Sequence, residues 1–145
     1  MRFLAWHVDH FKCRITQRDR SPLVEEFADP ATETGEALLV LASVEKQDEA
    51  APDIVADRAA AELAAHAAKL KIGTVVLHPF AHLFAEPSLP AVAVQVLKLV
   101  EAGLSARQLT VVRTPFGWFN TLDIQAKGHP LSRIARTVTA DPPGT

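Results

Sequence analysis

The chain has 145 residues, 48% of them hydrophobic and 22% charged, and its formal net charge is −2. This length and composition predict a single globular domain over residues 1–145, and no apolar run approaches the ~18 residues of a membrane-spanning helix. The slight negative charge argues against a broad electrostatic surface for nucleic acid. The single cysteine, Cys13, excludes an internal disulfide and a multi-cysteine zinc site, and it fits a protein of the reducing cytoplasm.

The N-terminal part of the chain predicts strands and a charged loop. Apolar and polar residues alternate over residues 2–8 and 11–17, which predicts two strands in a hairpin-like opening. Residues 18–35 are charged and are interrupted by proline and glycine, so we expect a loop there, with at most a short strand over residues 23–27. The continuous apolar run over residues 37–44 predicts a buried strand.

The middle of the chain predicts two helices with a strand between them. The alanine-rich residues 52–70 begin with proline, which suits the first position of a helix, and Gly73 follows just past their end. Residues 74–77 predict a buried strand. The second helix is expected to begin at Pro90, with Ser88 as its N-cap, and to close at Gly103.

The last third of the chain predicts further strands. They are expected over residues 109–112 and 118–126, on either side of a turn at residues 115–117. A short helix or turn is expected over residues 131–137, and a frayed tail over residues 141–145. The order of elements predicts an α/β fold with two main helices and a mixed, largely antiparallel sheet.

Three segments follow apolar runs, at the points where strands of a sheet would deliver their terminal loops: residues 43–46, 78–83 and 114–120. The last two segments bend at proline or glycine and combine aromatic with polar side chains. Three such loops on one edge would line a pocket that suits a flat base and a small amino acid. The other interpretation is that the aromatic side chains only close the end of a core, which is their commoner fate.

The motifs give little support to metal or covalent chemistry. His7 and His10 would point to opposite faces of a strand, and Pro79 disrupts the helical spacing of His78 and His82, so we expect no zinc site. No nucleophile elbow, phosphate-binding loop or dinucleotide glycine pattern occurs, and no cofactor is predicted. Chemistry would then come from backbone donors, a positioned water or the substrate itself. Buried or hydrogen-bonded histidines are the expectation for His7, His66 and His78.

The motif blocks Ser43-Val44-Glu45-Lys46, Pro79-Phe80-Ala81-His82-Leu83, Pro115-Phe116-Gly117 and Lys127-Gly128-His129-Pro130-Leu131 occur in this order along the chain. Together they closely resemble the N-terminal editing domain of archaeal-type threonyl-tRNA synthetases, over essentially the whole chain. That family has the fold of D-aminoacyl-tRNA deacylases, and it hydrolyses the ester of serine mistakenly attached to threonine tRNA. The resemblance implies an aminoacyl-tRNA deacylase that uses the ribose 2′-hydroxyl of its substrate and no metal.

The resemblance also implies roles for individual positions. Backbone groups of Val44 and Ala81 would meet the seryl group and the attacking water, Phe80 and Phe116 would wall the pocket, and Gly117 would permit close backbone approach. The implied catalytic residues are Asn120, His82, Ala81 and Val44. The implied substrate-binding residues are Ser43, Glu45, Lys46, Pro79, Phe80, Phe116, Gly117, Trp118, Phe119 and Arg133.

Two departures from the family pattern bear on activity. Phe119-Asn120 stands where the family usually has Tyr-Lys, and Arg133 stands where it has Glu. Altered substrate preference and lower activity are both open, so the alternatives are a deacylase for D-aminoacyl-tRNA or another mischarged tRNA, or a non-catalytic module that binds an amino acid or a tRNA end. The implied partners are the aminoacyl 3′ end of threonine tRNA, a synthetase core and a second copy of the chain in a homodimer.

Overall fold

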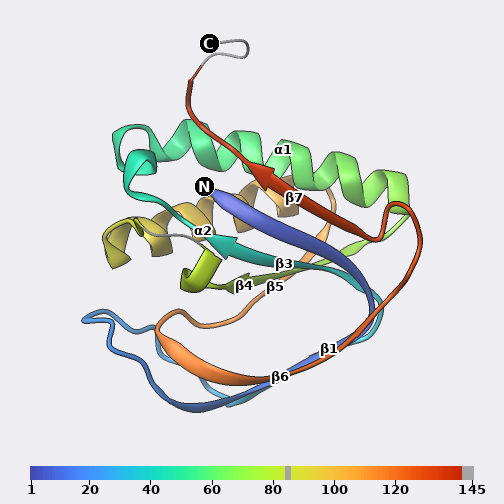
Figure 1. The fold of residues 1–145 in the computed structure, drawn as a ribbon, viewed down its shortest axis with the longest axis horizontal. Helices are drawn as coiled ribbons and strands as arrows, with labels where there is room; N and C mark the ends of the chain where they lie inside the picture. Colours follow the sequence, from blue (N-terminus) through green and yellow to red (C-terminus); the bar gives the residue numbers. More distant parts are fainter. Residues whose placement is uncertain (84–85, 142–145) are drawn as a thin grey trace.

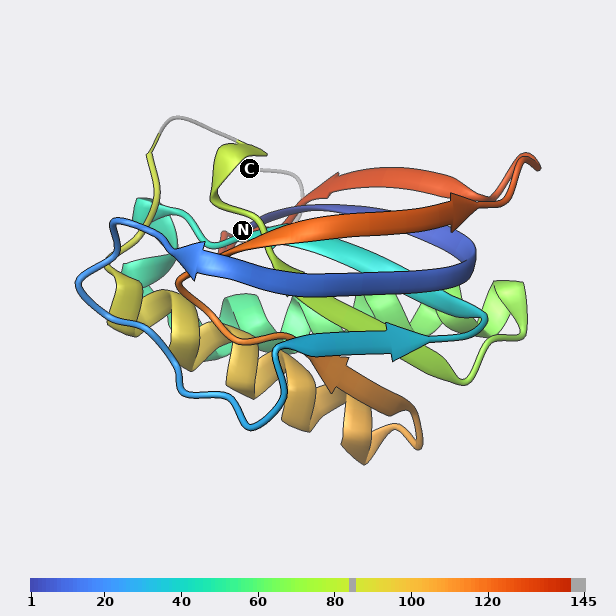
Figure 2. The same cartoon turned by 90° about the horizontal axis from the view of Figure 1, so that it is seen from below.

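The computed structural model describes residues 1–83 and 86–141, and for His82 it describes the backbone alone. Seven strands form one sheet, and two long helices lie on one side of it (Figure 1, Figure 2). The strands are β1 (Arg2–Arg18), β2 (Ala31–Thr34), β3 (Ala37–Ser43), β4 (Thr74–Pro79), β5 (Thr110–Arg113), β6 (Trp118–Ala126) and β7 (Arg133–Thr137). The helices are α1 (Pro52–Leu70) and α2 (Pro90–Ala106), with short 3-10 turns at Lys46–Ala50 and Ala81–Leu83.

The sheet is organised around the long strand β1. Its first part, up to Val8, pairs with β3 on one side and β7 on the other, both antiparallel. Its second part pairs with β2 and β6, also antiparallel, and the ladder to β6 shifts register between Val8 and His10. The β3–β4 and β4–β5 pairs are parallel. The mixed, largely antiparallel sheet with two main helices confirms the predicted fold class.

Strand β3 is buried along its whole length because core side chains cover both of its faces. Leu38 and Val40 belong to the core under the two helices, which also contains Phe3, Leu63 and Leu97. On the other face, alternate β3 side chains meet residues from the second part of β1 and from β4. This second core consists of Val8, Phe11, Cys13, Ala37, Leu39, Leu41 and Val76. Cys13 is a small buried side chain, and none of the described helices is long and apolar enough to span a membrane.

Several local predictions are wrong, and long-range pairing explains two of them. The predicted hairpin of residues 2–8 and 11–17 is one strand, because the bulge near Val8 lets β1 continue and exchange its partners. The short helix or turn expected over residues 131–137 is wrong for residues 133–137, which form strand β7 by pairing with Arg2–Trp6 on the edge of β1 opposite β3. Residues 23–27 form no strand, and β2 was not predicted. Residues 142–145 of the expected tail lie outside the described residues.

The predicted start of α2 at Pro90 is confirmed, but its predicted N-cap and its predicted end at Gly103 are wrong. The N-cap is Leu89 without a side-chain hydrogen bond, while the Ser88 hydroxyl donates to the Leu89 carbonyl at 3.0 Å. Gly103 lies inside the helix, which continues to Ala106. A Cβ atom at Gly103 would come within 2.9 Å of the Ala60 Cβ, so this glycine allows α1 and α2 to cross closely.

Candidate active site

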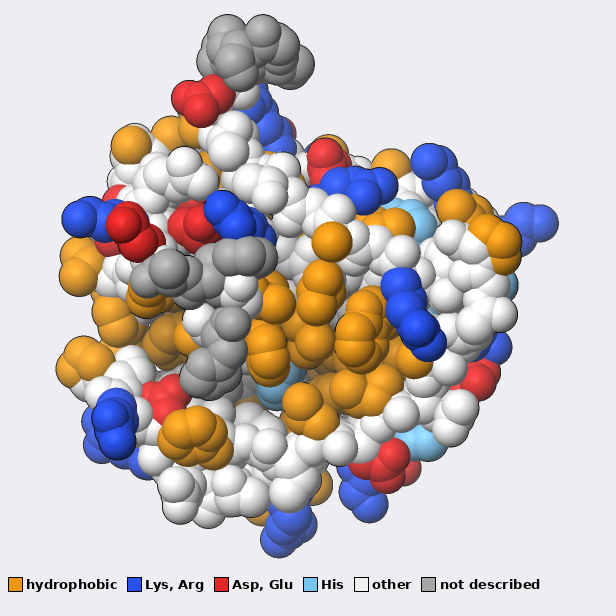
Figure 3. Space-filling model, viewed as in Figure 1, with side chains coloured by type: hydrophobic (Ala, Val, Ile, Leu, Met, Phe, Trp, Pro, Cys, Tyr) orange, Lys and Arg blue, Asp and Glu red, His pale blue; other side chains and the backbone are white. Residues whose placement is uncertain are grey.

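Two adjoining cavities lie where β3 and β4 end. Because these strands are parallel, their carboxyl ends meet at one edge of the sheet. The loops that follow them therefore lie together, as the sequence predicted. The Phe80 N–H donates to the Ala42 carbonyl at 2.8 Å, and the Ser88 N–H donates to the Val44 carbonyl at 3.0 Å. The first bond holds Phe80 beside Ala42, and the second holds Ser88 beside Val44. Figure 3 shows hydrophobic side chains gathered in a hollow of the face seen in Figure 1.

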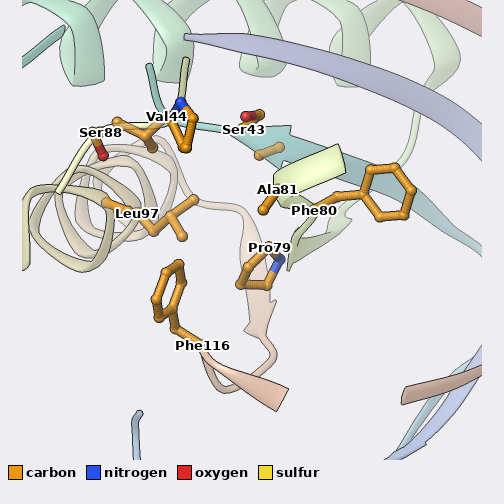
Figure 4. Close-up of a pocket in the computed structure, with 11 residues that line it drawn as sticks. Ser43, Val44, Pro79, Phe80, Ala81, Ser88, Leu97 and Phe116 are labelled. Carbon is orange, nitrogen blue, oxygen red and sulfur yellow. The ribbon is translucent and has the colours of Figure 1, made fainter. Parts of the chain in front are cut away.

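The smaller cavity, called the narrow cavity below, has a volume of about 40 Å³ and a mostly apolar wall. In Figure 4 the side chains of Val44, Leu97, Pro79 and Phe116 converge on it, while the Phe80 ring extends away from this group. Leu97 is buried in the helix-side core, so this part of the wall is held by core packing. The narrow cavity is lined by Ala42, Ser43, Val44, Pro79, Phe80, Ala81, Pro87, Ser88, Ala93, Leu97 and Phe116.

The larger cavity, called the wide cavity below, has a volume of about 240 Å³. It shares Pro79, Phe80 and Ala81 with the narrow cavity, so these three residues form the partition between them. Its lining combines aromatic and polar side chains and contains no lysine or arginine among the described residues. The wide cavity is lined by Asp19, His78, Pro79, Phe80, Ala81, Trp118, Phe119, Asn120 and Leu122.

The aromatic turn before β6 is held by the charged loop that precedes β2. The Glu25 carboxylate accepts the Phe116 N–H at 3.0 Å and also pairs with Arg113. Burial alone would raise the pKa of Glu25, but the hydrogen bonds from Arg113 and Phe116 hold this pKa below its ordinary value. The Trp118 Nε1–H donates to the Glu25 carbonyl at 2.8 Å. One loop residue thus anchors walls of both cavities.

Gly117 permits a close approach within the chain itself. Its φ is +95°, and a Cβ atom there would lie 2.6 Å from Val24 Cγ1 and 2.9 Å from the Leu23 carbonyl oxygen. The Gly117 carbonyl accepts the Asp19 N–H at 3.1 Å. Gly117 lines neither cavity, so its contacts seat the turn against the loop.

His78 is buried at the end of β4 and also lines the wide cavity. Its Nδ1 lies 2.8 Å from the Thr114 hydroxyl, and its ring packs edge-on against Phe11 with 5.8 Å between ring centroids. Burial lowers the pKa of His78 to about 4, so the imidazole is neutral at physiological pH. The prediction of buried, hydrogen-bonded histidines is confirmed for His78, and also for His7 and His66.

The structure brings most of the predicted site residues together. Nine line one cavity or both: Ser43, Val44, Pro79, Phe80, Ala81, Phe116, Trp118, Phe119 and Asn120. The Asn120 Nδ2–H donates to the Trp118 carbonyl at 3.2 Å, and its Oδ1 is enclosed without a partner among the described residues. The side chain of His82, predicted to be catalytic, lies outside the described residues.

Besides Gly117, three predicted substrate-binding residues lie away from the cavities. Glu45 is buried, accepts a hydrogen bond from Arg2 Nε at 3.1 Å and lies 3.6 Å from the Met1 ammonium group. Lys46 is exposed, and its N–H donates to the Glu86 carbonyl. Arg133 on β7 stacks over the Trp6 ring at 5.9 Å. None of the three lines a cavity.

Other lining residues were missed by the sequence reasoning. Asp19 comes from the charged loop, and Ala93 and Leu97 come from α2. His78 had a usable signal, because it directly precedes Pro79 at the end of a predicted strand. Its assignment to the core was correct but incomplete.

The lining limits the chemistry that its side chains can perform. Neither cavity is lined by a cysteine, and the described residues hold no group of three or more metal-ligating side chains. Ser43 and Ser88 line the narrow cavity, but the described part of the chain places no histidine or carboxylate in hydrogen-bond contact with either hydroxyl. The site offers shape, backbone groups, neutral hydrogen-bonding side chains and the Asp19 carboxylate.

Comparison with known proteins gives a consistent match over the whole chain. The family model described as the archaea-specific editing domain of threonyl-tRNA synthetase matches residues 1–138. Similar proteins include the threonine–tRNA ligases of Methanobrevibacter smithii (39% identical, covering 97% of this chain) and Methanopyrus kandleri (38% identical, covering 97%). The threonine–tRNA ligase of Methanosarcina acetivorans is 37% identical and covers 100% of the chain.

The chain spans only 23%, 22% and 22% of the length of these three relatives. The matching region is therefore one part of a longer enzyme in each relative. Since the family model covers nearly every residue that the structure describes, the chain belongs to the family of archaea-specific editing domains of threonyl-tRNA synthetase.

Proposed function

We propose that this chain hydrolyses the ester of seryl-tRNA(Thr) and so removes serine mistakenly attached to threonine tRNA. The observation that carries the proposal is the pair of cavities on either side of residues 79–81. The narrow cavity would take the serine side chain, and the wide cavity, with its aromatic wall, would take the rest of the tRNA end. Membership in an editing-domain family supports this assignment.

Discrimination between serine and threonine favours a second binding pocket that is smaller than the pocket that accepts threonine. Serine and threonine differ by one methyl group, which is worth only ~1–3 kcal/mol in a binding pocket. A synthetase that must accept threonine cannot reject serine strongly by binding alone. A cavity of about 40 Å³ with walls fixed by Leu97 and Phe116 would admit the seryl side chain and exclude the added methyl of threonine.

The proposed reaction needs no side-chain nucleophile. A water held by backbone groups of Val44 and Ala81 attacks the ester carbonyl carbon, and the bond between that carbon and the ribose oxygen breaks. The proton lost by the water passes to the departing ribose oxygen with the help of the neighbouring 2′-hydroxyl, which gives serine and uncharged tRNA. Preorganised backbone donors would stabilise the negative charge that develops on the carbonyl oxygen.

The proposal extends to partners. The tRNA-bound substrate would arrive either in trans or from a synthetase core joined to this domain. The cytoplasmic location of this protein and its assembly into a homodimer stay predictions. Elution volume with light scattering at several concentrations would test the dimer.

The direct test uses seryl-tRNA(Thr) and threonyl-tRNA(Thr) incubated with the protein. We expect rapid loss of the seryl ester and slow loss of the threonyl ester. A panel with D-aminoacyl and other mischarged tRNAs separates this function from that of a deacylase with another substrate. Equal lifetimes of all esters with and without the protein would contradict any deacylase function and leave a binding module.

A further inference from the structure

His78, which lines the wide cavity, has a side-chain nitrogen without a role in the proposed reaction. His78 Nδ1 contacts Thr114, and Nε2 has no hydrogen-bond partner in the described part of the chain. The enclosed side-chain atoms without a partner in that part are Thr34 Oγ1 and Asn120 Oδ1, and His78 Nε2 is not among them. Since His78 lines the wide cavity and its Nδ1 is occupied by Thr114, we take Nε2 as the polar atom of the ring on the cavity side.

The contacts of Thr114 are the basis for assigning the tautomer of His78. The Thr114 hydroxyl lies 2.8 Å from His78 Nδ1 and donates to the Leu77 carbonyl at 3.4 Å. We assign the hydroxyl proton to this carbonyl, which only accepts, and in that tautomer the His78 Nδ1–H donates to Thr114. His78 Nε2 is then unprotonated and accepts hydrogen bonds from the cavity.

The negative charge in the lining of the wide cavity favours a cationic hydrogen-bond donor in the ligand. Asp19 is the charged residue in its lining, and no lysine or arginine side chain lines it among the described residues. Burial keeps the imidazole neutral, because it lowers the pKa of His78 to about 4. An aminoacyl ester carries one cationic donor, the α-ammonium group, and this group lies beside the carbonyl carbon that water attacks.

We propose that His78 positions the substrate by accepting, through Nε2, a hydrogen bond from the α-ammonium group of the aminoacyl ester, in a ring orientation fixed by Thr114. This inference rests on the proposed function, because it names the part of the same substrate that the wide cavity recognises. The ester then lies across residues 79–81, with its side chain in the narrow cavity and its amino group in the wide cavity. Asp19 adds a favourable field at the same place.

Binding of two stable analogues tests the proposal without hydrolysis. One is 3′-serylamido-3′-deoxyadenosine, and the other carries a hydroxyl group in place of the α-amino group. In the unaltered protein we expect the amino analogue to bind at least ~10-fold more tightly, since hydrogen bonds to charged groups are the stronger ones. In His78→Phe, which keeps a flat ring without the acceptor, we expect the two analogues to bind within about twofold of each other.

Matched variants separate the hydrogen bond from general damage. Thr114→Val removes the oxygen that fixes the ring and should shrink the preference for the amino analogue, while Thr114→Ser should retain it. His10→Phe makes the same substitution at an exposed histidine that lines neither cavity, and it should retain the full preference. Unchanged binding of the hydroxyl analogue shows in each case that the site is folded.

Each contrary result has a definite meaning. Equal binding of both analogues to the unaltered protein overturns the proposal, and so does a preference that survives His78→Phe. If His78→Phe weakens both analogues by the same factor, Nε2 serves the nucleoside, and the assignment to the ammonium group is wrong. Hydrolysis of seryl-tRNA(Thr), measured separately, reports whether the proposed function itself holds.

Discussion

The narrow and wide cavities share three residues but are built in different ways. The narrow cavity takes part of its wall from the hydrophobic core, where Leu97 and Ala93 of α2 are already fixed by packing. The wide cavity takes its wall from strand ends and a charged loop, and its polar groups have incomplete hydrogen bonding. Exclusion of a ligand by shape needs a rigid wall, whereas recognition of its polar groups needs unpaired polar groups in the protein. The two cavities meet these two needs at one edge of the sheet.

The largest expected effect concerns the buried imidazole of the wide cavity. The pKa of His78 is lowered from 6.5 to about 4 by burial, so between these values the unfolded chain binds a proton that the folded chain does not. Stability contributed by the neutral ring is therefore full above pH 6.5 and falls as the pH decreases toward 4, by about 3 kcal/mol in total. Urea unfolding at several pH values measures this loss.

The variant His78→Phe should flatten that part of the pH profile. His66 provides the control, because burial also lowers its pKa but it lines neither cavity. His66→Phe should leave most of the slope in place. A profile for His78→Phe with the same slope as the unaltered protein would show that His78 titrates normally.

The second largest effect is expected from enlarging the narrow cavity, which would remove its exclusion by shape. Phe116→Ala removes part of its wall, and we expect the preference for the seryl over the threonyl ester to fall by about 10- to 200-fold, since one methyl group in a pocket is worth that much. Initial rates of deacylation of both esters measure this ratio. Leu131→Ala, at an exposed apolar residue, should leave the ratio unchanged.

The third effect concerns the support that both cavities receive from the charged loop. Glu25→Gln removes the charge that pairs with Arg113, and we expect a loss of about 1–2 kcal/mol of stability at pH 7. Because the pKa of Glu25 is lowered, its contribution is present above its ordinary pKa of 4.5 and is lost as the pH falls through the folded value. The variant should therefore lose less stability on acidification below pH 4.5 than the unaltered protein.

Glu101→Gln is the matched control for that prediction. Glu101 pairs with the same Arg113 at 3.0 Å but is more exposed than Glu25 and has no bond to Phe116. We expect thermal unfolding to show the smaller destabilisation for Glu101→Gln. The opposite order would mean that Glu25 is not the main anchor of the turn.

The smallest effect sharpens the role of the wide cavity. Asn120→Lys restores the residue type expected from the family pattern, and we expect seryl-ester hydrolysis to rise by a few-fold, or about 1 kcal/mol in activation free energy. Single-turnover rates measure the change. An unaltered rate would show that position 120 does not limit the reaction.

Local sequence patterns predicted those parts of the fold that local physics determines. Helices beginning at Pro52 and Pro90, and the buried strands at residues 37–43 and 74–79, carry their signals within a few residues. Strand β7 does not, because Ile134 and its neighbours become a strand only by pairing with the start of β1. Gly103 resembled a helix end because its reason, contact with Ala60, lies on another helix.

The site shows the same division. The motif blocks identified the loops that line both cavities, including Phe116 and Asn120. They also assigned Glu45 to the substrate, although its carboxylate lies against Arg2 and the Met1 ammonium group, which are contacts between distant parts of the chain. His78 was assigned to the core because one residue's pattern cannot show that a ring is both buried and at the edge of a cavity.

The pairing of β1 with β7 has a consequence for the order of folding. Arg2 lies opposite Thr137 in this ladder, so the start of β1 can pair on this edge only after the residues of β7 have been synthesised. Contacts of such long sequence separation form late and slowly. The start of β1 must therefore spend most of the domain's synthesis with its outer edge unpaired, and we expect nascent chains that end before β7 to be sensitive to proteases there.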